Sequence, residues 1–226
     1  MKTTLIAAGL LFGGLVFAEA DFGKIYAEAG KAAKAKDFAA AEAKYGEAAD
    51  AAKNSQQKCL AVLGKFQAMR GQKKGVSAEK FALKAVEEDE MLKPQEIRQI
   101  LNTVADSLVW TPRMDFALEL LKQASQQSCP AGNNIYYATY YSMSVIYSRK
   151  KQYQDMIEVL DHVLKVKNQH PANLYNANRL TGIAYEKLGK KDEALNHYRK
   201  ALEYGKKVRY KFDYSAAEKA IERLSR

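Results

Sequence analysis

A pattern of three side chains that returns about every 38 residues constrains this sequence most strongly. Its clearest copy is Ala194, Tyr198 and Ala201, where spacings of four and three put a small, a large and a small side chain on one face of a helix. The same register returns at four earlier places: Ala41, Tyr45 and Ala48; Ala78, Ala82 and Ala85; Ala117, Leu121 and Ala124; and Met156, Leu160 and Val163. A register kept over five copies predicts a repeat protein.

Each triplet is predicted to lie on the second helix of a helix pair. Small side chains let two helices cross closely, and a single pair buries its remaining apolar face only by stacking on the next pair. Breaks at Pro, Gly and Asn separate the pairs, and Thr111-Pro112 is expected to start a second helix because Pro suits the first helical turn. The first helices are predicted over residues 25–34, 57–70, 96–110, 135–149 and 176–188.

Gly182 and Tyr185, followed by the triplet at Ala194, resemble the tetratricopeptide repeat (TPR) family in spacing and residue type. Asn178 and Thr181 depart from that family's pattern, and the period here is longer. The resemblance implies an all-α, right-handed superhelix of about five helix pairs over residues 21–207.

The last residues, 208–226, are predicted to form a helix that caps the array. Ser215 and Glu218 have the spacing of a capping box. The helix would turn one apolar stripe toward the last pair, made of Ala217, Ala220, Ile221 and Leu224.

Residues 1–20 have the pattern of a secretory signal peptide. Lys2 precedes an apolar run over residues 5–17, and Ala18-Glu19-Ala20 is a small-x-small cleavage site. We expect cleavage after Ala20 and a periplasmic or secreted chain with no membrane span; an uncleaved anchor is the weaker alternative, because the apolar run is short for a span.

The two cysteines, Cys59 and Cys129, leave their redox state open. An exported chain could join them in a disulfide. Free thiols are favoured, because two cysteines far apart in sequence are too few for a disulfide framework.

No catalytic constellation is recognisable in the sequence. His162, His170 and His197 lack the spacing of a metal-binding motif. No glycine-rich phosphate loop is present, since the stretch FGGLVF belongs to the predicted signal peptide. We therefore expect neither an enzyme nor a cofactor or metal. The net charge of +10 alone does not predict nucleic-acid binding, because an exported chain without a nucleic-acid motif rarely meets that partner.

The resemblance implies that the first helices line a concave groove that grips a peptide or a helix. Repeat register and residue type then select seven candidate partner-binding residues: Gln99, Asn102, Asp106, Tyr137, Tyr141, Asn176 and Arg179. For each of these residues an ordinary polar surface is the alternative. Tyr140 and Tyr147, in the same tyrosine-rich stretch, are expected in the core. Tyr26 and Gly30 stand where the family's carboxylate clamp has Lys and Asn, so an acidic C-terminal peptide is not expected.

The favoured function is a scaffold or adaptor of the cell envelope that binds another protein or peptide. An alternative is a module that binds an acidic envelope polymer, since residues 173–226 carry 13 Lys and Arg against 7 Asp and Glu. Effects of side-chain changes and of salt would separate the two. The partner's identity and the oligomeric state stay open.

Overall fold

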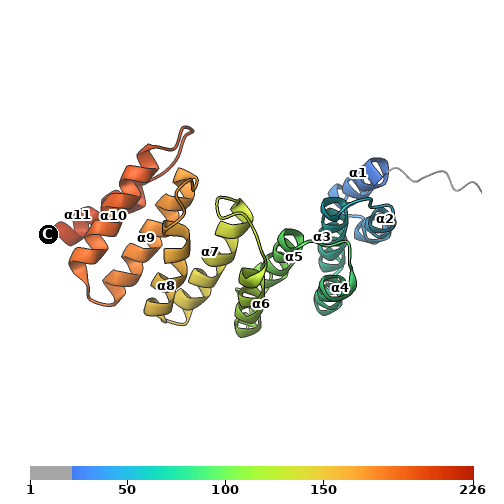
Figure 1. Ribbon diagram of the computed structural model, residues 1–226, viewed down its shortest axis with the longest axis horizontal. Helices are drawn as coiled ribbons and strands as arrows, with labels where there is room; N and C mark the ends of the chain where they lie inside the picture. The colour runs from blue at the N-terminus through green and yellow to red at the C-terminus, as the bar shows by residue number, and fades with distance from the viewer. Residues whose placement is uncertain (1–21) are drawn as a thin grey trace, which may run out of the picture.

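A computed structural model describes residues 22–226 of the chain, so the predicted signal peptide and its cleavage site lie outside the described residues. Within them, eleven α-helices follow one another as five pairs and a final single helix (Figure 1). This confirms the all-α helix array. The helices are α1 (Phe22–Lys34), α2 (Phe38–Asp50), α3 (Ser55–Gly71), α4 (Gly75–Glu88), α5 (Pro94–Asp106), α6 (Met114–Gln126), α7 (Asn134–Arg149), α8 (Tyr153–Leu164), α9 (Pro171–Lys187), α10 (Lys191–Lys206) and α11 (Ser215–Ser225).

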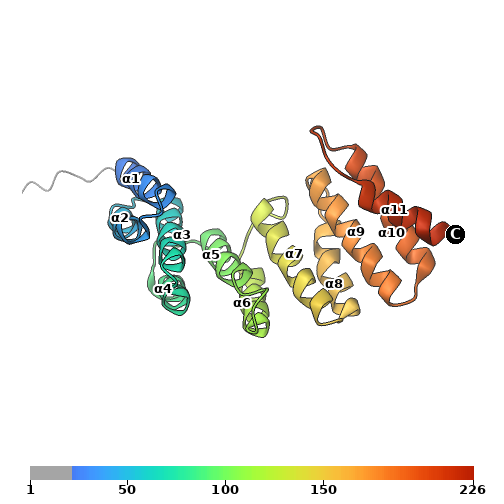
Figure 2. The same cartoon turned by 180° about the vertical axis from the view of Figure 1, so that it is seen from behind.

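The pairs stack in chain order into an elongated array, with α1 at one end and α11 at the other (Figures 1 and 2). The helix axes turn along the array: α3 and α4 are seen nearly end-on where α9 and α10 are seen from the side (Figure 1). The first helices α1, α3, α5, α7 and α9 also contact one another in succession. We call the surface that these first helices form the inner face.

The repeated triplet occupies the crossings between helices, as its residue types predict. Ala41, Ala117, Ala124, Ala194 and Ala201 are fully buried. The weaker copy at Met156, Leu160 and Val163 is also fully buried, whereas Ala85 is only half-buried. Small side chains at these positions allow the close approach on which stacking depends.

A left-handed residue closes the turn of every pair except the third. Lys36, Lys73, Lys151 and Gly189 have φ of 62°, 62°, 58° and 75°, and each lies two residues before its second helix begins. Pro112 takes this place in the third pair. Its ring fixes φ near −65°, so it cannot adopt the left-handed conformation.

The third pair therefore differs from its prediction. The helix expected over residues 96–110 ends at Asp106, and α6 begins at Met114 rather than at Pro112. Residues 107–113 form turns instead, stabilised by bonds such as that from the Thr111 amide to the Leu108 carbonyl (2.9 Å).

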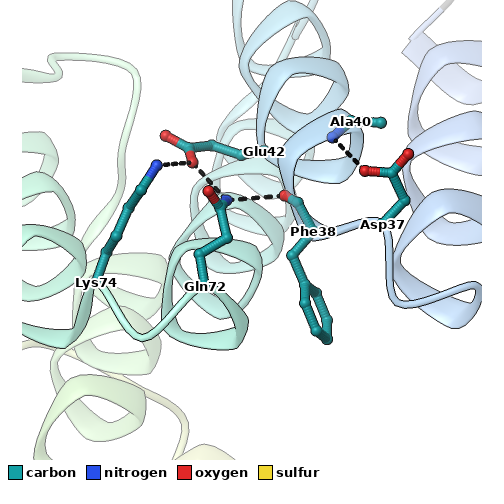
Figure 3. A network of polar contacts seen from close by, with 6 residues as sticks. All are labelled: Asp37, Phe38, Ala40, Glu42, Gln72 and Lys74. Carbon is teal, nitrogen blue, oxygen red and sulfur yellow. Dashed lines mark hydrogen bonds and ion pairs between the residues drawn. The ribbon is translucent and has the colours of Figure 1, made fainter.

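In the first half of the array, polar contacts connect the turn of one pair to the second helix of the preceding pair (Figure 3). Gln72 Nε2 donates to the Phe38 carbonyl at 3.0 Å and to Glu42 at 2.7 Å, and Lys74 Nζ lies 3.2 Å from the same carboxylate. One repeat later, Arg113 pairs with Glu79 at 2.5 Å. Lys74 and Arg113 each immediately precede a second helix, so the two ion pairs are repeat-equivalent.

The two ends of the fifth pair differ from the sequence prediction. Pro171 is the first residue of α9, which begins five residues earlier than expected, because Pro is accepted where a helical amide needs no partner. At α11, Ser215 is already helical and does not cap; Asp213 accepts the Ser215 amide at 2.9 Å instead. Ala217 and Ala220 are buried on the fifth pair, in two clusters that include Ala201 and Tyr198, respectively.

Candidate functional site

A hollow of about 340 Å³ lies on the inner face between the end of α5 and helix α7. We call it the tryptophan hollow. It lies where residues 107–113 follow α5 without the left-handed turn that the other pairs have. Its lining residues are Asp106, Val109, Trp110, Tyr137, Ala138, Tyr141, Ser142 and Val145.

Trp110 forms an exposed wall of this hollow. Its side chain is 75% exposed, and it is the only tryptophan in the sequence. The Arg149 guanidinium lies over its ring at 4.4 Å and donates to the Val109 carbonyl at 2.6 Å. The ring is therefore held in place from α7 while it stays accessible to a partner.

Asp106 is the one charged side chain among the lining residues. Ser142 Oγ donates to its carboxylate at 2.5 Å, which fixes the carboxylate against α7. The surrounding side chains raise the pKa of Asp106 by displacing water, and the Ser142 hydrogen bond opposes that rise. Among residues 22–226, no Lys, Arg or His forms an ion pair with Asp106.

Tyr137 and Tyr141 stand one turn apart on α7, with ring centroids 5.5 Å apart. Burial raises the pKa of Tyr137, and a neighbouring tyrosine raises it further. A hydrogen bond with Asn176 of α9 and the charge of Arg179 act in the opposite direction.

The structure brings together four of the seven candidate residues. Asp106, Tyr137 and Tyr141 line the tryptophan hollow, and Asn176 of α9 forms a hydrogen bond with Tyr137. Arg179 of α9 does not line the hollow and acts on Tyr137 through its charge. Gln99 lies apart from them, half-buried, with its side-chain oxygen 3.8 Å from Cys59 Sγ.

Asn102 differs most from its predicted role. It is 6% exposed, and its amide donates to the Ile135 carbonyl at 3.2 Å and to Thr139 Oγ1 at 3.0 Å. Both donors are used between α5 and α7, so they cannot serve a partner. The register places the residue correctly along the helix, but α7 covers it.

Arg98, which sequence reasoning missed, lies beside Asn102 in the same interface. Its side chain is 2% exposed; Nε donates to Thr139 at 2.8 Å and Nη1 to the Gln127 carbonyl at 3.2 Å. The guanidinium lies over two rings, those of Tyr136 at 4.9 Å and Tyr140 at 5.5 Å. These contacts join α5, α7 and the preceding loop, and so position the helices that form the hollow. No sequence motif marks a buried arginine.

A second hollow of about 310 Å³ lies on the inner face two pairs earlier, between α1 and α3. Five of its lining residues, Ala33, Leu60, Leu63, Gly64 and Gln67, are repeat-equivalent to Val109, Ala138, Tyr141, Ser142 and Val145 of the tryptophan hollow, in that order. The other lining residues are Tyr26, Phe38, Tyr45 and Ala68. We call it the aliphatic hollow after Leu60 and Leu63 of α3. Leu63 stands where the tryptophan hollow has Tyr141, the rings here come from Tyr26, Phe38 and Tyr45, and no lining residue is charged.

Comparison with solved structures identifies the architecture. The chain superposes on a crystal structure of MamA with a TM-score of 0.59 and 20% identity, covering 85% of this chain and 97% of that one. It also superposes on YrrB, described as a TPR protein with an unusual peptide-binding site, with a TM-score of 0.56 and 16% identity over 91% of this chain and 100% of that one. The chain has a TPR-like fold. No protein-family model matches the sequence of this TPR-like chain, and no curated protein does.

The described part of this TPR-like chain was also compared with the requirements of metal, membrane and thiol sites. Residues 22–226 contain no group of His, Cys, Asp and Glu that could hold a metal ion, and no helix among them is long and apolar enough to cross a membrane. Both cysteines are free thiols. Burial raises the pKa of Cys59 to about 12 and also raises that of Cys129, so neither is activated as a thiolate.

Proposed function

We propose that this chain is a non-enzymatic scaffold that holds a peptide or a helix of another protein along its inner face. The observation that carries the proposal is the pair of repeat-equivalent hollows, each between two successive first helices. Hollows at matching positions suit a ligand that runs along the array and places one side chain in each. Aromatic and aliphatic walls with few polar groups are typical of such anchor sites.

We further propose that the scaffold works in the cell envelope. This rests on the signal-peptide pattern of residues 1–20. Expression in a bacterial host followed by fractionation and intact-mass measurement tests it. We expect an extracytoplasmic protein that begins at Asp21; a chain that keeps residues 1–20 and partitions with membranes would contradict the proposal.

The binding proposal is tested on Tyr141, which lines the tryptophan hollow. A partner is first identified by a pull-down from envelope extract with the mature chain and mass spectrometry, and is then purified for titration. Truncating an aromatic anchor typically costs about 2 kcal/mol, so Tyr141→Ala should weaken binding roughly 30-fold. A melting curve of the variant shows whether the fold is intact.

The matched control is a pair of exposed lysines, Lys206 and Lys207, at the end of α10. Changing both to Gln should leave protein binding nearly unchanged. Binding to an acidic polymer predicts the reverse order, with steep weakening as salt rises. If the lysine variant loses more affinity than Tyr141→Ala, the inner face is not the site.

A further inference from the structure

We propose that the tryptophan hollow receives a lysine or arginine side chain of the bound polypeptide. The inference rests on the proposed function, because it assigns a chemistry to one anchor of a ligand on the inner face. Its basis is the juxtaposition of one carboxylate, Asp106, with the aromatic rings of Trp110, Tyr137 and Tyr141.

The charge of the lining favours a cation. Asp106 alone among the lining residues is charged, and within residues 22–226 it has a hydrogen bond from Ser142 but no cationic partner. An apolar anchor would remove water from this carboxylate and give nothing in exchange, and an acidic anchor would be repelled by it. A lysine or arginine head group compensates the charge as it displaces the water.

The aromatic walls suit the rest of such a side chain. Lys and Arg have apolar stems that pack on rings while the charged head reaches a polar group. A cation over a ring is also attracted by the π electrons. The structure contains one example at this place, since the Arg149 guanidinium lies 4.4 Å over the Trp110 ring.

The charges of two arginines outside the lining oppose an incoming cation. Arg149 is held by Trp110 and by the Val109 carbonyl, and Arg179 acts on the Tyr137 hydroxyl. Neither lines the hollow. Their repulsion means that the rings alone are not enough, so the selectivity for Lys or Arg must depend on Asp106.

The aliphatic hollow supplies the internal comparison. It has the same place in the repeat but Gln67 where the tryptophan hollow has Val145, and no charged lining residue. Its anchor should therefore be apolar. A ligand that occupies both hollows would carry one apolar and one basic side chain.

The test uses the full mature chain and a displayed library of random peptides. Selected peptides are synthesised and titrated while the emission of Trp110, the sole tryptophan, is followed. We expect each peptide that shifts this emission to contain an essential Lys or Arg. Replacing that residue by norleucine, which keeps an alkyl stem and removes the charge, should weaken binding about tenfold.

The Asp106→Asn variant completes a double-mutant cycle. Asp106→Asn should weaken binding of the parent peptide by about the same factor. In this variant, replacing the basic residue of the peptide by norleucine should reduce the affinity little further. The control is Glu119→Gln, which removes one negative charge, as Asp106→Asn does, from an exposed side chain of α6. This variant should bind the peptide like the wild type.

Three outcomes overturn the inference. The anchor is not cationic if the norleucine peptides bind the wild type as tightly as the parent peptides do. The same holds if Asp106→Asn binds the parent peptides as tightly as the wild type does. In both cases binding on the inner face stands. If peptides bind without changing the Trp110 emission, the hollow is not their site. If no peptide binds at all, the proposed function itself fails and the inference falls with it.

Discussion

Gly182 lies against the ring of Tyr198: a Cβ added to Gly182 would stand 2.9 Å from Cε1 of that ring. The ring cannot move aside easily, because Tyr198 is 2% exposed and its hydroxyl donates to Glu186 at 3.1 Å. The two helices of the fifth pair, α9 and α10, therefore owe their close crossing to the missing side chain.

Gly182→Ala should lower the free energy of unfolding by an amount on the order of 1 kcal/mol, because overpacking outweighs the better helix propensity of Ala. Urea denaturation followed by circular dichroism measures it. Gly75→Ala is the control, since no heavy atom lies within 4 Å of a Cβ added there. A loss of stability in the control that equals the loss at Gly182 would mean that the crossing is not the cause.

The buried alanines of the triplets predict a second effect. Ala124 and Ala201 are fully buried at crossings, so Ala124→Leu and Ala201→Leu should each cost roughly 1–3 kcal/mol. Lys190 is exposed, and Lys190→Ala should change stability by less than about 0.5 kcal/mol. The comparison uses denaturant titrations of the three variants; similar values for all three would contradict the repeat register.

The left-handed turn residues predict a gain in stability. Lys151 has φ of 58°, which a residue with a Cβ adopts at a cost of about 1–2 kcal/mol. Lys151→Gly should stabilise the chain by about 0.5 kcal/mol after the entropy of Gly is subtracted. The reverse change, Gly189→Ala at φ of 75°, should destabilise it by about 1 kcal/mol. Melting temperatures that move the same way for both variants would exclude the explanation.

His197 predicts a pH dependence of stability. Burial lowers its pKa, and the nearby charge of Lys200 lowers it further; its Nδ1 lies 3.1 Å from Asn178 Oδ1. The unfolded chain therefore binds this proton more tightly than the folded one. The contribution of the neutral His197 to the stability of the folded chain is complete above the ordinary histidine pKa of about 6.5. It is lost as the pH falls below that value.

Denaturant titrations at about pH 7.5 and about pH 5.5, roughly one unit above and one unit below that pKa, measure the effect. His197→Gln should reduce the loss of stability at the lower pH, because the variant has no imidazole to protonate at this position. An unaltered pH dependence in the His197 variant would assign it to other groups.

The fold was predictable because the residues that make helix crossings are of few types. The small size of Ala194 and Ala201 is enough to predict that they pack between helices, and the spacing of four and three residues recurs along the chain. Helix ends were less predictable. Pro112 and Pro171 look alike in sequence, yet only Pro171 starts a helix. Pro112 instead holds a position that needs a left-handed residue, a conflict that appears only when the turns are compared across pairs.

The candidate site was predictable in register but not in exposure. Tyr137, Tyr141 and Asp106 line the hollow because they lie on first helices at inner-face positions. Asn102 shares that face, and yet the bulk of α7 covers it. Trp110 was assigned to a helix, so its exposed ring could not be foreseen. Whether a polar side chain meets a partner or a neighbouring helix depends on how closely two helices approach, which side-chain spacing does not determine.

Pro112 also bears on how many ways a ligand can sit on the array. A strictly periodic surface has translational symmetry, so an extended segment could shift by one repeat and find the same contacts again. The interrupted turn of the third pair breaks that symmetry, because it places a unique indole beside a carboxylate at a single point. A segment bound there would have one register along the array instead of several equivalent ones. An irregularity of the backbone would fix that register.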